Sequence, residues 1–315
     1  MEAFETLHKL AQDPEGRASI QAKFTLEPAW TSDPNETIAD LDMDNVFAGL
    51  ISLFMWPVQF NAVDWSDVQN ICSFFEDDSR SSIDSLSALR MDPKMGYGTH
   101  PLSSSNDADL QYYIDMLDFV DGHGDTYSDD ELAGLLWTWQ NCNEFGFMRS
   151  TDSANGAFGT HLRLNFYIDM CEKLFGIGMD QIENSVVRSN YHHGGRSRYS
   201  GTNVVLPYGD ADPWHPLGIL ERGNLDDSIV PIVINGTSHC ADTYEATDAD
   251  PPELTQARKT ILDNIQKWLA SAPSPSTTAQ TTNMTTTSVS PTTSSACTIP
   301  LIFSLIVSFI AFCLQ

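Results

Sequence analysis

The sequence has few basic residues, and their scarcity excludes one large class of partners. Only 16 Lys and Arg stand against 43 Asp and Glu in 315 residues, which gives a formal net charge of −27. Binding to a nucleic-acid backbone needs clusters of Lys and Arg, and the sequence contains none. We therefore expect no nucleic-acid partner. An acidic surface suits solubility in an extracellular or acidic compartment.

Closely spaced cysteine pairs of the metal-binding kind and an N-terminal export signal are also missing. None of the six cysteines belongs to a C-x-x-C pair, so the usual zinc spacings are absent. We expect neither a metal nor another cofactor. The first nine residues contain neither an apolar run nor a basic segment before one, and they do not form a signal peptide.

The C-terminal end has the composition of a protein attached to a cell surface. Residues 272–297 are dominated by Ser and Thr, which is typical of an extended, O-glycosylated stalk. Residues 298–315 are almost wholly apolar. This tail is open to three interpretations: a glycolipid-anchor signal, a short membrane helix or a buried helix. No basic stop-transfer residue follows it, which favours the anchor, with Asn283, Ser288 or Ser290 as the attachment site.

Sequons for N-glycosylation occur at Asn35, Asn235 and Asn283. Together with the tail they favour the secretory route, to the extracellular face of a membrane or an endolysosomal compartment. A protein on that route needs an export signal, so the simplest explanation is that the N-terminus of this chain is truncated.

The globular part divides into two regions. Residues 1–128 show helical patterns broken by polar stretches, with a buried helix expected over 46–56 and a loop over 92–109. The second region, residues 129–271, follows Ser128, which forms with Glu131 the pattern of a capping box that begins a helix. Further helices are expected over 164–175 and 252–270, and short β-type runs over 203–206 and 228–234.

Two potentially reactive side chains follow the two β-type runs. Asp212 comes after the first run and His239 after the second. In parallel α/β sheets the chemistry lies beyond the carboxyl ends of the strands. A Ser-His-Asp triad needs a His that takes the serine proton and an Asp that orients this His. In α/β-hydrolases the chain order is Ser, Asp, His, which this pair fits.

Longer motifs around these residues resemble one family. Residues 209–215 (Gly-Asp-Ala-Asp-Pro-Trp-His) and 236–242 (Gly-Thr-Ser-His-Cys-Ala-Asp) are similar to the Asp and His motifs of the lysosomal Pro-Xaa carboxypeptidase family. Residues 137–146 resemble its Trp-x-Tyr-Gln-x-Cys-x-Glu-Phe-Gly segment, and residues 169–176 match another. The likeness is strongest to the thymus-specific serine protease branch, and it is looser before Glu131.

The resemblance implies an α/β fold: the C-terminal part of an α/β-hydrolase domain over 129–271, with a helical cap region over 1–128. It implies a proline-selective serine exopeptidase acting on peptides with proline near the cleaved bond. Asp212 would orient His239, the general base. Trp214 and Phe147 would wall the proline pocket, and Cys142 and Cys171 would form a disulfide.

The sequence departs from the family pattern in two respects. The chain contains no Gly-x-Ser-x-Gly elbow, and Met1 falls inside the cap region beyond the family's elbow, so we expect this chain alone to be inactive. Thr151 stands where the family often has a cysteine.

Two alternative functions stay open. One is a non-catalytic cell-surface glycoprotein derived from such a peptidase, and the other is a different α/β-hydrolase such as a lipase, against which the residues around Trp214 and Cys142 argue. The choice between carboxypeptidase and dipeptidyl peptidase specificity stays open.

Overall fold

The computed structural model describes residues 2–61, 68–95, 100–124, 126–153 and 156–271. The expected stalk and apolar tail, with Asn283, lie outside these residues. The interpretations of the tail as a glycolipid-anchor signal or a membrane helix therefore concern residues that the structure does not describe. In the part of the chain that the structure describes, no helix combines the length and the apolar character needed to cross a membrane.

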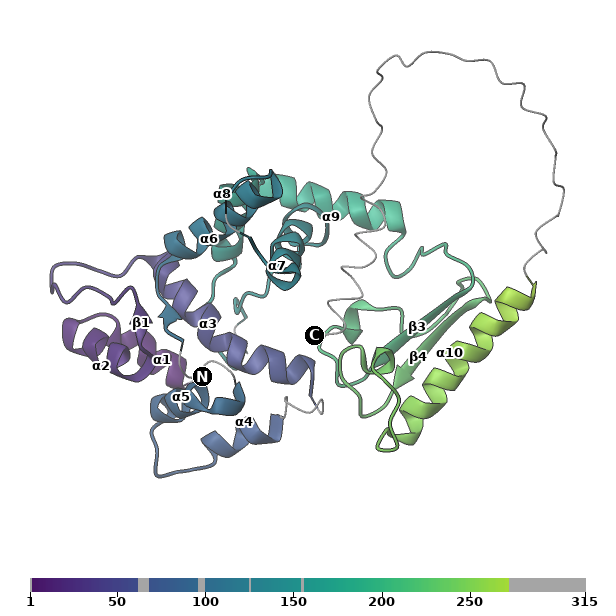
Figure 1. Cartoon of the computed structure of the whole chain (residues 1–315), viewed down its shortest axis with the longest axis horizontal. Coiled ribbons are helices and arrows are strands. Elements are labelled where there is room, and N and C mark those ends of the chain that lie inside the picture. Colours follow the sequence, from purple (N-terminus) through teal and green to yellow (C-terminus); the bar gives the residue numbers. More distant parts are fainter. Residues whose placement is uncertain (1, 62–67, 96–99, 125, 154–155, 272–315) are drawn as a thin grey trace, which may run out of the picture.

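Helices dominate the described residues (Figure 1). In chain order the helices and strands are α1 (Glu2–Leu10), α2 (Pro14–Phe24), β1 (Leu26–Glu27), α3 (Asp40–Gln59), α4 (Val68–Phe75), α5 (Ser82–Met91), β2 (Leu102–Ser103), α6 (Asn106–Val120), α7 (Asp129–Gln140), α8 (Leu164–Phe175), α9 (Met179–His193), β3 (Val204–Gly209), β4 (Ile229–Ile234) and α10 (Pro252–Ser271). Strands β1 and β2 form one short parallel pair, and β3 and β4 form another.

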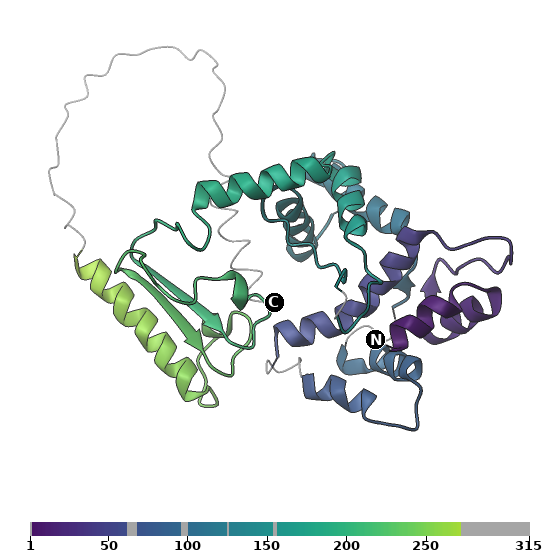
Figure 2. The same ribbon diagram turned by 180° about the vertical axis from the view of Figure 1, so that it is seen from behind.

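Helix α3 is the centre of the largest hydrophobic core. Its buried side chains Val46, Phe47 and Leu50 pack in one cluster with Phe4 of α1 and Leu86 of α5. The buried helix expected over 46–56 is therefore confirmed, and it is longer than expected at both ends. Figures 1 and 2 show α3 running from the helical part toward the region of β3 and β4.

Helix α7 begins where the sequence predicted. The Ser128 hydroxyl accepts from the backbone N–H of Glu131, and the Glu131 carboxylate accepts from the backbone N–H of Ser128, which completes the capping box. A single π-helical turn, Asn141–Phe145, follows α7. The predicted disulfide between Cys142 in this turn and Cys171 in α8 is confirmed, with the two Cα atoms 5.5 Å apart.

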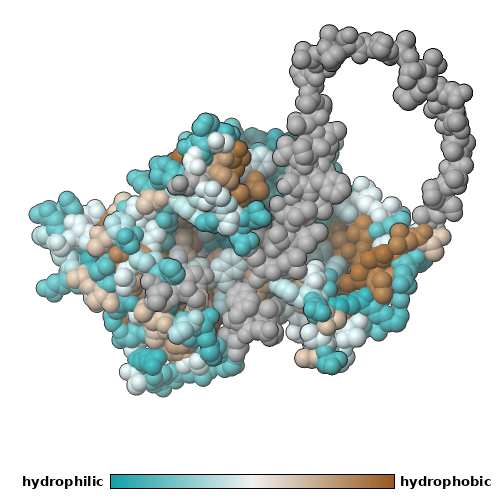
Figure 3. All heavy atoms as spheres, viewed as in Figure 1, coloured by the Kyte–Doolittle hydropathy of each residue, from teal (hydrophilic) through white to brown (hydrophobic). Residues whose placement is uncertain are grey.

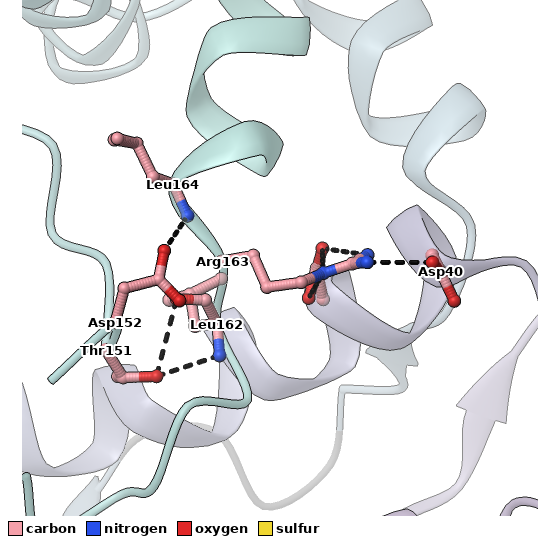
Figure 4. Close-up of polar contacts among 7 residues, drawn as sticks. Asp40, Thr151, Asp152, Leu162, Arg163 and Leu164 are labelled. Atoms are coloured by element: carbon pink, nitrogen blue, oxygen red, sulfur yellow. Dashed lines mark hydrogen bonds and ion pairs between the residues drawn. The ribbon is translucent and has the colours of Figure 1, made fainter. Parts of the chain in front are cut away.

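An arginine fork fastens the loop before α8 to α3. Arg163 donates to the buried carboxylate of Asp44 from Nη2 at 2.6 Å and from Nε at 3.0 Å, and to Asp40 from Nη1 at 2.7 Å (Figure 4). Asp152 accepts from the backbone N–H of Leu164 at 2.7 Å, which satisfies a donor of the first turn of α8. The loop is thereby held in place on the helical part.

Thr151 takes part in the same loop. Its hydroxyl accepts from the backbone N–H of Leu162 at 2.9 Å (Figure 4). Its own backbone N–H donates to the Leu162 carbonyl at 2.7 Å. Hydrogen bonds across the loop therefore hold the position at which the family often has a cysteine.

Strands β3 and β4 pair in parallel, with Val204 opposite Ile229 and Gly209 opposite Ile234. Both predicted β-type runs are confirmed, and β3 continues to Gly209, beyond the expected end at 206. Helix α10 packs on these strands through Leu254 and Ala257. The parallel pair fits an α/β architecture, and it contains only a small part of such a sheet.

Three features of the structure differ from what the sequence predicts or were not predicted. The loop expected over 92–109 ends early, because the Ser105 hydroxyl caps α6 by accepting from the backbone N–H of Ala108. Helix α9 was not predicted. The apolar face expected along α10 is buried only in its first turns, and Ile265 is 42% exposed, because two strands are too narrow to cover the rest. Figure 3 shows this hydrophobic surface over the C-terminal half of α10.

Candidate active site

Asp212 and His239 form a hydrogen-bonded pair beyond the carboxyl ends of β3 and β4. His239 Nδ1 lies 2.8 Å from Asp212 Oδ2. The second carboxylate oxygen, Oδ1, accepts from the backbone N–H of Trp214 at 2.8 Å. Asp212 is only 6% exposed, and the His239 side chain is 19% exposed. A buried carboxylate that binds Nδ1 fixes the orientation of the imidazole and favours the tautomer with the proton on Nδ1.

The register of the two strands brings the two loops together. Because Gly209 lies opposite Ile234, the loops leave the sheet side by side. The Asp210 carboxylate accepts from the backbone N–H of Gly236 at 2.7 Å, and the Ala211 N–H donates to the Thr237 carbonyl at 3.0 Å. A Cβ at Gly209 would lie 2.4 Å from that carbonyl oxygen, so only glycine allows the loops this close.

Four aromatic rings cluster beside the pair. Trp214 contacts Phe147, with ring centroids 5.6 Å apart, and meets Trp137 edge to face at 6.1 Å. Phe145 stacks on Phe147 at 5.4 Å. The structure thus brings together the two residues singled out from the sequence, Trp214 and Phe147. Trp137 and Phe145 were not predicted as site residues, although both lie within the 137–146 segment that resembles the family.

Phe147 also lines a cavity of about 290 Å³. This cavity is lined by apolar side chains, by the disulfide and by polar groups that include Asp109 and Tyr113. Burial, and then the nearby Asp109 carboxylate, raise the pKa of Tyr113, so this hydroxyl stays a neutral hydrogen-bonding group. Phe147 and Trp56 both line the cavity. Phe147 contacts Trp214 beside Asp212, and Trp56 stacks on Phe60, whose ring contacts the His239 ring.

The end of helix α3 is a further part of the site, and it was not predicted from the sequence. Gln59 is 9% exposed, and its side-chain Oε1 accepts from the indole N–H of Trp214 at 2.9 Å. Its carbonyl accepts from the backbone N–H of His239, also at 2.9 Å. No local sequence signal marks such a residue, because its partners are more than 150 positions away in the chain.

Two of the three sequon asparagines lie within the described residues, and both are exposed. The side chain and the backbone N–H of Asn35 donate to Asp33, whereas Asn235 lies at the end of β4, close to the candidate site. Thr237 of the second sequon is 5% exposed, and its hydroxyl donates to the Ile234 carbonyl at 2.9 Å.

Within the described residues, no group of three or more His, Cys, Asp or Glu side chains is arranged to hold a metal ion.

Residues 1–261 match the family model for serine carboxypeptidase S28. Over 282 residues the chain is 32% identical to a candidate serine protease of Caenorhabditis elegans, a match that covers 85% of this chain and 50% of the relative. It is 33% identical over 146 residues to the thymus-specific serine protease of Homo sapiens, covering 45% of this chain and 28% of the relative. It is 26% identical over 139 residues to the lysosomal Pro-X carboxypeptidase of Homo sapiens, covering 44% and 27%.

The chain spans at most about half the length of each of these relatives. The family match covers both the helical part and the strands that carry Asp212 and His239. This chain therefore belongs to the serine carboxypeptidase S28 family.

Proposed function

We propose that this chain carries the Asp and His of the catalytic triad of a proline-selective serine exopeptidase. The observation that carries the proposal is the 2.8 Å contact between His239 Nδ1 and the buried carboxylate of Asp212. With Nδ1 bound in this way, Nε2 is the nitrogen that accepts a serine proton, and Asp212 stabilises the imidazolium that forms. The nucleophile elbow and the oxyanion donors belong to a segment that precedes the helical cap region, residues 1–128.

Sequencing the transcript upstream of the Met1 codon tests this assignment. We expect an open reading frame that continues upstream and encodes an export signal and a Gly-x-Ser-x-Gly elbow after a β-type run. A frame that closes without an elbow would instead favour the non-catalytic surface glycoprotein. This result does not depend on whether the protein has been expressed or folds in a given host.

We also propose that the aromatic cluster formed by Trp137, Phe145, Phe147 and Trp214 binds the substrate proline. A proline ring is compact and apolar, and aromatic faces bury it without needing a hydrogen bond. The family relationship supports this assignment, since one relative is named a Pro-X carboxypeptidase. Peptides are the expected substrates.

Replacing Phe147 with Ala should lower kcat/KM for a proline substrate by about 5–30-fold in the longer protein, which is this chain extended upstream to include the proposed nucleophile elbow. The reason is the loss of roughly 1–2 kcal/mol of aromatic contact with the ring. The same change should alter kcat/KM much less for a peptide with alanine in place of proline. Trp139→Ala is the matched control, because Trp139 lies on the same helix α7 but is 38% exposed. Equal losses on both peptides in Phe147→Ala would assign this ring to the fold rather than to proline binding.

We further propose that a glycolipid holds the mature protein on the outer face of a membrane. The support is the order of the sequence features: a Ser/Thr-rich spacer over 272–297, then the apolar stretch over 298–315. Phosphatidylinositol-specific phospholipase should release the protein from expressing cells into the medium. Retention on cells from which a control anchored protein is released would favour a membrane helix.

A further inference from the structure

The last turn of α3 contacts both catalytic loops at once. Gln59 is the final residue of α3, and it accepts one hydrogen bond from each loop. Phe60 and Asn61, which follow Gln59 in the chain, add two more contacts with the His239 loop. The Ser238 hydroxyl donates to the Asn61 carbonyl at 2.6 Å, and the Phe60 ring meets the His239 ring edge to face at 5.7 Å.

These contacts close a ring of four hydrogen bonds. Gln59 Oε1 accepts from the Trp214 indole N–H at 2.9 Å, and the Trp214 backbone N–H donates to Asp212 Oδ1 at 2.8 Å. Asp212 Oδ2 binds His239 Nδ1 at 2.8 Å, and the His239 backbone N–H returns to the Gln59 carbonyl at 2.9 Å. A shift of any member therefore displaces its two neighbours.

Substitution of Gln59 removes a hydrogen-bond acceptor from the ring while Asp212 and His239 both remain. Gln59 is 9% exposed and Trp214 is half-buried, so the loss of the acceptor would leave the indole N–H of Trp214 without its hydrogen-bond partner in the protein. Trp214 would then shift toward another acceptor and pull the backbone N–H that binds the Asp212 carboxylate. That carboxylate sets the orientation of His239.

We infer that Gln59 is a positioning residue, which aligns the Asp212–His239 pair through Trp214 and sets its place relative to the helical part. Helix α3 also lines the cavity, with Ala48, Ser52 and Met55. One continuous helix therefore fixes the Asp212–His239 pair relative to this cavity. The inference rests on the proposed function for its catalytic meaning, whereas the alignment itself is a property of this chain.

The test uses the 315-residue chain without substrate. The hydrogen on His239 Nδ1 is followed by proton NMR with selectively labelled histidine, and its exchange rate with water is measured. Gln59→Leu removes the acceptor and keeps most of the volume, and Trp214→Phe removes the donor and keeps an aromatic ring. We expect each variant to speed this exchange about tenfold, whereas Gln59→Glu, which retains an acceptor, should stay near the parent rate.

The double variant Gln59→Leu/Trp214→Phe is the decisive comparison. If the two side chains act through their shared hydrogen bond, the double variant exchanges no faster than the faster of the two single variants. Val58→Ala is the matched control, since Val58 precedes Gln59 on α3 and is 40% exposed; it should leave the exchange rate unchanged. Additive effects, or an unchanged rate in both single variants, would overturn the inference. If Gln59→Leu fails to fold, Trp214→Phe and Gln59→Glu still carry the test.

Activity gives a second readout that separates this inference from the proposed function. In the longer protein, Gln59→Leu should lower kcat about tenfold and leave KM nearly unchanged, because the alignment of the base matters most in the transition state. A longer protein without peptidase activity would refute the proposed function, and the exchange measurement would still decide the role of Gln59.

Discussion

Replacing His239 with Ala in the longer protein should lower kcat for peptide hydrolysis by about 10⁴-fold or more. Without the imidazole no group takes the proton from the serine, and residual turnover would come only from substrate binding and the oxyanion donors. Asp212→Asn should cost about as much, because an amide at this position favours the wrong tautomer of His239. The measurement is kcat on a peptide with proline at the cleaved bond.

Two comparisons make this result specific. The double variant His239→Ala/Asp212→Asn should be no slower than His239→Ala alone, because the two residues act as one unit. His193→Ala removes an exposed histidine at the end of α9 and should leave kcat unchanged. Activity within tenfold of the parent in His239→Ala would mean that different residues perform the catalysis.

Replacing Arg163 with Ala should lower the free energy of unfolding by roughly 3 kcal/mol at neutral pH. The change leaves the Asp44 carboxylate, with a side chain only 2% exposed, without its cation. The Asp40 partner of the same arginine has an 82% exposed side chain, so Asp40→Ala should cost well under 1 kcal/mol. Urea denaturation of the 315-residue chain measures both values.

The pH dependence of this loss identifies its cause. Burial raises the pKa of Asp44 above its ordinary value of 3.8, and Arg163 opposes that rise. Removing Arg163 raises the pKa further. A raised carboxylate pKa means that the contribution of Asp44 to stability is fully present below its unfolded pKa and is lost as the pH rises through its folded pKa. The deficit of Arg163→Ala should therefore shrink from pH 7 toward pH 4, whereas a constant deficit would indicate lost packing rather than an uncompensated charge.

The parts of the fold that were predicted correctly have local signals. Ser128 and Glu131 mark the start of α7 within four residues of sequence, and the apolar runs that became β3 and β4 are rich in Val and Ile. Helix α9 lacks such a signal, because it is mostly polar and buries only Ile182 and Ser185. Its N-terminal residue before the first turn is Gly178, which has no capping side chain.

In the candidate site, too, the residues that were predicted have a local sequence signal and the one that was missed has none. Asp212 and His239 were found because each follows a strand, and the motifs around them resemble a family. Gln59 could not be found in this way. Its two hydrogen bonds join α3 to loops more than 150 residues away, and a glutamine near the end of an apolar helix is as typical of a helix terminus as of a site. Contacts of this kind depend on how the helical part packs on the strands, which local patterns do not encode.

Peptidase activity of the 315-residue chain, measured beside that of the longer protein, tests the central claim most directly. The claim is that Asp212 and His239 serve a serine that lies outside this chain. We predict no hydrolysis of a proline-containing peptide by the 315-residue chain, and hydrolysis that depends on His239 by the longer protein. Proline-directed hydrolysis by the 315-residue chain would contradict the claim, and hydrolysis that survives His239→Ala would also show that different residues perform it.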